Sequence, residues 1–143
     1  MLPAMQFICD APRGTWFRIE TEAEAEAEAA LMRHAVDKYF RRHLAAAKES
    51  YSAPAGAAAF ERDIGLKRHI ETTMPLYLTL RADDGEGLAT AMLPPQGRNQ
   101  VNFRIIIVGP ENADPYVTQA GAIAALEAKF GLALKREDCF PYA

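Results

Sequence analysis

The segment from Thr21 to Ala47 constrains the fold more than any other part of the chain, because its composition favours one long helix. It reads TEAEAEAEAALMRHAVDKYFRRHLAAA, and although Glu and Ala alternate at its start, both are good helix formers and poor strand formers. Thr21 and Glu24 have the spacing of a capping box. From Met32 onward, apolar residues recur every three or four positions, which predicts a stripe able to lie on a sheet.

Two β-hairpins are predicted from alternating runs that flank turn-forming residues. The first pairs residues 5–10 with residues 15–20 around the loop APRG. The second pairs residues 76–81 with residues 88–93 around the loop DDGEG. Short links of this kind favour antiparallel pairing of the strands.

Residues 101–108, VNFRIIIV, form the strongest predicted strand, because β-branched residues dominate the run and suit a central position in a sheet. Side chains alternate between the two faces of a strand, and this one is apolar on both faces near its end. Ile106 and Val108 therefore need a cover. A second copy of the protein in a homodimer would supply it, and so would the tail residues Phe140 and Tyr142.

The region between the long helix and the second hairpin is less determined. Residues 57–64 favour a short helix ended by Gly65. Residues 66–73 fit either a helical turn or an edge strand, because their apolar spacing is typical of neither.

A second, shorter helix is predicted from Asp114 or Thr118 to about Phe130, with Gly131 at the C-terminal position. With two hairpins before and between the helices, the chain is expected to form an α+β fold. We predict a two-layer sandwich, a mainly antiparallel sheet of about five to six strands with one long and one shorter helix packed on one face. A length of 143 residues suits a single domain, 1–143.

Charge and composition argue against several classes of partner. The formal net charge of −3 gives no general attraction to nucleic acid. The chain does not begin with a basic segment followed by an apolar one, and no run reaches the length of a bilayer span, so we expect a cytoplasmic protein without membrane contact. Cys9 and Cys139 lack a CxxC spacing and predict neither a metal site nor a disulfide framework.

Alternation along the predicted strands suggests that three arginines and two aromatic residues share one open sheet face. Guanidinium groups recognise carboxylate or phosphate through paired hydrogen bonds, and aromatic rings add stacking. The face would then bind an anionic or planar ligand. The alternative is an ordinary solvated sheet face. The predicted ligand-binding set is Trp16, Arg18, Tyr77, Arg81 and Arg104.

The catalytic candidates are His69 and Glu71, which would share a face and form an acid and base pair if residues 66–73 were a strand. His34 and His43 do not have the spacing of a helical zinc site, and the chain contains no HExxH, GxGxxG or GxxxxGK[ST] motif. We therefore expect neither a metal nor a cofactor.

No motif ties the chain to a particular chemistry, so three functions are carried forward. The first is a small, non-catalytic protein-interaction or ligand-binding domain that forms a homodimer. The second is an enzyme or sensor for a small anionic molecule, bound by Arg81 and Arg104 with His69 as acid or base. The third is a single-stranded nucleic-acid binder that uses the arginine and aromatic face, and its binding would weaken steeply with salt.

Overall fold

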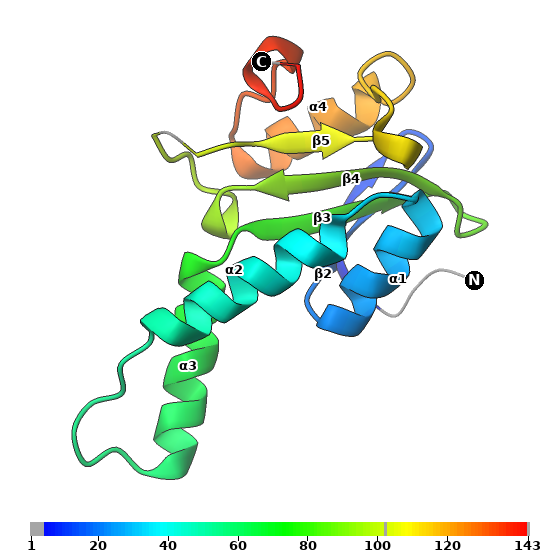
Figure 1. Ribbon diagram of the computed structural model, residues 1–143. Coiled ribbons are helices and arrows are strands. Elements are labelled where there is room, and N and C mark those ends of the chain that lie inside the picture. The colour runs from blue at the N-terminus through cyan, green and yellow to red at the C-terminus, as the bar shows by residue number, and fades with distance from the viewer. Residues whose placement is uncertain (1–4, 102, 143) are drawn as a thin grey trace.

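The computed structural model describes residues 5–101 and 103–142, which form an α+β fold around a five-stranded antiparallel sheet (Figure 1). The strands lie in the sheet in the order in which they occur in the chain, so each pairs with its neighbour in sequence. They are β1 (Gln6–Ala11), β2 (Gly14–Ile19), β3 (Leu76–Arg81), β4 (Gly87–Leu93) and β5 (Ile106–Val108).

Four α-helices accompany this sheet in the described residues, together with three short 3₁₀ turns. The antiparallel α+β class and both predicted hairpins, β1–β2 and β3–β4, are confirmed. The helices are α1 (Glu22–Met32), α2 (Val36–Ser50), α3 (Ala59–Thr73) and α4 (Ala120–Phe130).

The predicted long helix is divided into α1 and α2. The capping box at its start is confirmed, because the Thr21 hydroxyl accepts from the Glu24 N–H and the Glu24 carboxylate accepts from the Thr21 N–H. The prediction that the helix continues past Met32 is wrong. Arg33 adopts the left-handed conformation, with φ 55° and ψ 53°, and donates its N–H to the Ala29 carbonyl, which ends the first helix.

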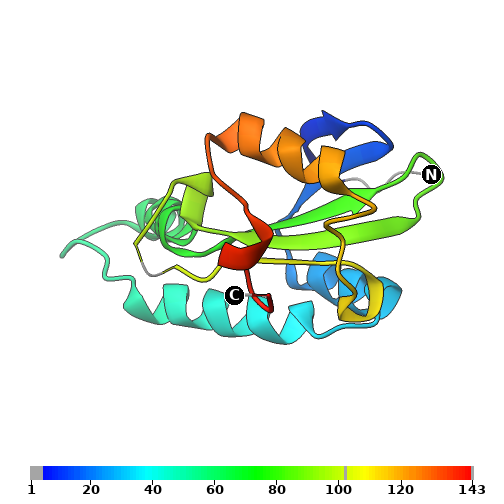
Figure 2. The same ribbon diagram turned by 90° about the horizontal axis from the view of Figure 1, so that it is seen from above.

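The helices cover both faces of the sheet. Figure 2 shows α4 on one side of the strands and α1 with α2 on the other. The prediction that the helices pack on one face of a two-layer sandwich is therefore not confirmed. The physical reason lies in the strands. Leu78 and Leu80 of β3 are buried against α4, and the alternating Tyr77 is buried against α2, so both faces needed a cover.

The strand predicted for residues 101–108 is much shorter and lies at the edge of the sheet, so its central position is wrong. Asn102 lies outside the described residues, and Val101 is 89% exposed. Only three residues of β5 pair with β4. Near its C-terminus the chain returns to this segment, where the Phe140 N–H donates to the Ile105 carbonyl at 2.8 Å.

Residues 66–73 belong to α3, which resolves the choice between a helical turn and a strand. Gly65 does not end a helix but lies inside α3, where the absence of a side chain leaves room for the Tyr51 ring. Figure 1 shows α3 beside the far end of α2, projecting from the sheet. None of the α3 residues is fully buried.

The final helix begins later than either predicted cap. The Asp114 carboxylate accepts from the Tyr116 N–H in the preceding turn, and α4 starts only at Ala120. Its C-terminal prediction is confirmed, because Gly131 takes the left-handed conformation with φ 67°.

Candidate functional site

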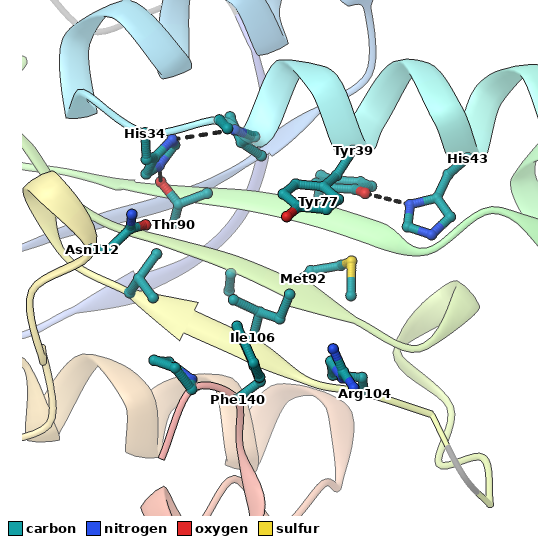
Figure 3. A pocket seen from close by; sticks show the side chains of 15 residues that line it. His34, Tyr39, His43, Tyr77, Thr90, Met92, Arg104, Ile106, Asn112 and Phe140 are labelled. Atoms are coloured by element: carbon teal, nitrogen blue, oxygen red, sulfur yellow. Dashed lines mark hydrogen bonds between the residues drawn. The ribbon is translucent and has the colours of Figure 1, made fainter. Parts of the chain in front are cut away.

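A cavity of about 480 Å³ lies between α2 and the C-terminal residues, over the face of β3, β4 and β5 that α1 and α2 cover only in part (Figure 3). We call it the α2 groove. Its volume lies in the range typical of small-molecule sites. It is lined by His34, Ala35, Val36, Tyr39, His43, Tyr77, Thr90, Ala91, Met92, Arg104, Ile106, Val108, Asn112, Phe140 and Pro141.

The floor of the groove consists of side chains that face one another across the strands. Tyr77 of β3 lies opposite Met92 of β4, which in turn lies opposite Ile106 of β5. Thr90 lies opposite Val108 in the next such row. The floor is therefore mainly apolar, with Tyr77 and Thr90 as its polar members, and Tyr39 also borders the groove.

At one end, His34 leads into a buried network around Glu28. The carboxylate of Glu28 is fully buried and accepts from the Thr79 hydroxyl at 2.8 Å and from the Thr90 hydroxyl at 2.5 Å. It also forms an ion pair with Arg81 at 2.8 Å. His34 Nε2 lies 2.8 Å from the Thr90 oxygen, so the network reaches from the interior to the groove wall.

The hydrogen bonds fix the proton on His34. Its Nδ1 accepts from the Val36 N–H at 3.4 Å, so the neutral ring carries its proton on Nε2 and donates it to Thr90. Thr90 in turn donates to Glu28. Burial lowers the pKa of His34 below its ordinary value, and the nearby Glu28 carboxylate opposes this shift only in part. His34 is thus a neutral, fixed hydrogen-bonding group.

At the other end, His43 of α2 meets Tyr77 of β3 with 2.5 Å between Nδ1 and the phenol oxygen. Burial raises the pKa of Tyr77 well above its ordinary value. Burial also lowers the pKa of His43, and the neighbouring Arg42 lowers it further. Both groups are therefore neutral near pH 7, as the low-dielectric surroundings of the groove require.

Arg104 borders the same end, with its guanidinium carbon 4.9 Å from the centre of the Phe140 ring. It is the one formally charged residue among those lining the groove. Carboxylates near the groove already have cationic partners, since Glu28 pairs with Arg81 and Glu111 pairs with Arg33. In the part of the chain that the structure describes, Arg104 forms no ion pair.

The structure brings together only two members of the predicted ligand-binding set. Tyr77 and Arg104 both line the α2 groove. Arg81 is on the same sheet face but is held in the buried pair with Glu28. Trp16 lies on the opposite face, fully buried, and donates its indole N–H to the Ala122 carbonyl at 2.9 Å. The shared open face of three arginines and two aromatics is therefore wrong.

Arg18 is the remaining member of that set. It pairs with Leu78 in the sheet register, so alternation assigns it to the strand face away from Tyr77. It borders a separate cavity of about 300 Å³, which residues of α2 and α3 also line.

His69 and Glu71 do not form the predicted acid and base pair. Both lie on α3, where residues two apart are separated by roughly 200° around the axis and so point in different directions. His69 Nε2 lies 2.7 Å from the Ser50 hydroxyl. Neither residue lines the α2 groove.

The C-terminal residues supply part of the predicted cover for Ile106 and Val108. Phe140 lies beside β5 and borders the groove with Ile106. Tyr142 instead packs against Tyr116, with ring centres 5.8 Å apart. The tail leaves the floor of the groove accessible, and the homodimer stays a prediction.

Sequence reasoning missed the groove residues His34, Thr90 and Asn112, and assigned no role to Glu28. Glu28 stands in an alternating Glu and Ala run whose other acids are exposed or partly exposed, so nothing local marks it. His43 had a usable signal, because it lies beside the apolar stripe of the helix and so had to face the sheet.

The described residues offer little support for a metal site or a membrane span. In residues 5–101 and 103–142, no group of three or more His, Cys, Asp or Glu side chains is placed to hold a metal ion. Among the described helices, none combines the length and the hydropathy that crossing a bilayer requires. Cys9 and Cys139 are free thiols.

No protein-family model matches the chain, and neither a curated protein nor a solved structure matches it.

Proposed function

We propose that the protein is a binding domain that takes a small, largely apolar molecule into the α2 groove. The observation that carries this proposal is a cavity of about 480 Å³ whose floor is mainly apolar and which a few polar side chains border. Cavities with mainly apolar walls and a few placed polar groups are the usual form of small-molecule sites.

The floor supports this function because Ile106 keeps apolar surface that the fold leaves partly exposed, beside the buried side chains of Met92 and Val108. A ligand that removed this surface from water would gain about 25 cal/mol for each Å² of apolar area. The walls are largely preformed, since hydrogen bonds hold both His34 and His43 in place.

The other two functions receive less support from the same residues. The anion-processing enzyme would use Arg81 and Arg104 for binding and His69 as acid or base. Of these only Arg104 lines the groove, because Arg81 pairs with Glu28 and His69 lies on α3. A single-stranded nucleic-acid binder needs exposed aromatic faces for base stacking, and Trp16 exposes no surface.

The proposal is tested by filling the groove. The fluorescence of a neutral dye that responds to solvent polarity should rise on binding to the wild-type protein. Ile106→Trp should abolish the rise, because the indole occupies the space above the floor. Val117→Trp is the matched control, since Val117 is 88% exposed and lies outside the groove. Equal dye binding by both variants, or none by the wild type, would contradict the proposal.

A panel of small molecules can then be ranked by thermal unfolding of the same proteins. A ligand at about 100 times its dissociation constant stabilises the folded state by roughly 2.7 kcal/mol. For a chain of this length, that corresponds to an increase in midpoint of roughly 8 °C. The increase should disappear in Ile106→Trp and persist in Val117→Trp.

A further inference from the structure

We infer that the ligand of the α2 groove is an amphipathic carboxylate, with its carboxylate on Arg104 and its apolar body on the floor formed by Met92, Ile106 and Val108. This inference rests on the proposed function and adds the chemical class of the ligand. It follows from the distribution of charge, from the placement of Arg104 and from the hydrogen bonding of His43.

The charge of the groove favours an anion. Arg104 is the sole formally charged residue among its fifteen lining residues. Acidic residues near the lining have cationic partners in the described chain: Glu28 pairs with Arg81, Glu111 with Arg33, and Asp37 with Arg41. A ligand carboxylate beside Arg104 would therefore be attracted, and Arg42 adds positive charge at this end, since it acts on His43 and lies over the Tyr39 ring. An ammonium group at the same position would be repelled.

The placement of Arg104 suits a ligand that lies along β5. Ile106 and Val108 lie on one face of β5, and Arg104, two residues before the strand, lines the same groove, so the cation lies beyond one end of the apolar row. At about 3.3 Å per residue, a fully extended chain would separate Arg104 from Val108 by at most roughly 13 Å. An elongated apolar body with one charged end matches this pattern.

The Phe140 ring limits where the guanidinium can go. The ring centre is 4.9 Å from the guanidinium carbon, which is within the range of a cation–π contact. This contact leaves the N–H edges of the guanidinium available, and those edges form the paired hydrogen bonds that carboxylates accept.

His43 offers a second donor at the same end. The Tyr77 hydroxyl carries one proton, and among the described residues it forms a hydrogen bond with His43 Nδ1. When the Tyr77 phenol donates to Nδ1, the neutral imidazole carries its proton on Nε2. Figure 3 shows His43 at the end of the groove that Arg104 borders, so its Nε2–H faces the region where an anionic group would lie.

The test compares three ligands with the same ten-carbon chain, namely decanoate, decanol and decylamine, each below its aggregation concentration. Binding to the wild-type protein is measured by displacement of the neutral dye. Decanoate should bind roughly tenfold more tightly than decanol, as expected for charge-assisted hydrogen bonds, and decylamine should bind most weakly. Arg104→Gln should remove the preference for decanoate and leave the affinity for decanol unchanged.

Arg136→Gln is the matched control, because Arg136 is also stacked on an aromatic ring, Tyr142 at 4.3 Å, but lies outside the groove. It should keep the tenfold preference. If decanol and decanoate bind the wild type equally, or if Arg104→Gln keeps the preference, the carboxylate inference is overturned and the proposed binding function stands. If neither ligand nor the dye binds, both are overturned.

Discussion

The guanidinium of Arg81 donates to the carboxylate of Glu28 at 2.8 Å, at a position where the Glu28 side chain has no exposed surface. The same carboxylate accepts from the Thr79 and Thr90 hydroxyls, and Arg81 Nε also donates to Thr79 at 3.0 Å. Among the described residues, no buried side-chain nitrogen or oxygen lacks a partner. This network joins α1 to β3 and β4 beneath the groove.

Removing the cation should destabilise the protein strongly. Arg81→Met keeps much of the side-chain volume but leaves the Glu28 carboxylate buried without a counter-charge, and such losses cost about 3 kcal/mol or more. Urea unfolding would measure the change. Arg13→Met is the control, since Arg13 is exposed in the β1–β2 turn and should change the free energy of unfolding by less than about 0.5 kcal/mol. Similar values for the two variants would show that the pair contributes little.

Removing the hydroxyl that links the network to the groove should also be costly. Thr90→Val keeps the shape of the side chain and takes away the partner of both Glu28 and His34. The expected loss is about 2 kcal/mol, because the polar groups remain buried. Thr72→Val, on the exposed side of α3, serves as the comparison in the same urea experiment. A Thr90→Val protein as stable as Thr72→Val would contradict the role assigned to this hydroxyl.

The parts of the fold that follow from local chemistry could be predicted from the sequence. The β3–β4 hairpin depends on the turn DDGEG, where the Asp84 carboxylate accepts from the Glu86 N–H, and Gly85 takes φ 89°. The capping box of α1 likewise involves residues three apart, Thr21 and Glu24. Interactions within a few residues leave a recognisable pattern in the sequence.

The parts that depend on distant residues could not be predicted. Glu28 is buried because Thr79, Arg81 and Thr90 supply donors more than fifty residues away, and it looks like any solvated acid of the alternating run. The surroundings of β5 likewise include a distant residue, since Phe140 forms a bridge to Ile106 from 34 positions further along the chain. The groove depends on the burial of Glu28 and on the contact of Phe140 with β5, so its residues have no common signature in the sequence.

The break between α1 and α2 offers a third prediction. Arg33 has φ 55° without being glycine, a conformation that costs an L-residue roughly 1 kcal/mol. Its ion pair with Glu111 is exposed on both sides and contributes little. Arg33→Gly should therefore leave the free energy of unfolding unchanged or raise it by about 0.5 kcal/mol, despite the entropy that glycine adds to the unfolded chain.

Arg33→Ala separates the two contributions, because it removes the ion pair and keeps the strained backbone. It should be less stable than Arg33→Gly by roughly 1 kcal/mol in thermal or urea unfolding. If alanine were the more stable of the two, the left-handed conformation at this position would not be the cause of the break.

The pH dependence of stability gives the last prediction. Burial lowers the pKa of His34 below its ordinary value of 6.5, so the unfolded chain binds this proton more readily than the folded chain does. The contribution of neutral His34 is complete above that ordinary value and is lost as the pH falls through the folded-state pKa. His34→Gln keeps an N–H donor for Thr90 and does not titrate. It should therefore reduce the fall in the free energy of unfolding between about pH 7 and pH 5.

The decrease in slope should be partial, because burial lowers the pKa of His43 as well, and that residue stays in the variant. Adding His43→Gln should flatten the profile further, although the Tyr77 hydroxyl then needs the glutamine oxygen as its acceptor. Lys38→Gln, an exposed change on α2, should follow the wild-type profile. The measurement is a set of urea unfolding curves at constant ionic strength. A His34→Gln profile parallel to that of the wild type would mean that His34 takes up its proton equally well in the folded and unfolded states, against the hydrogen bonds that hold it neutral.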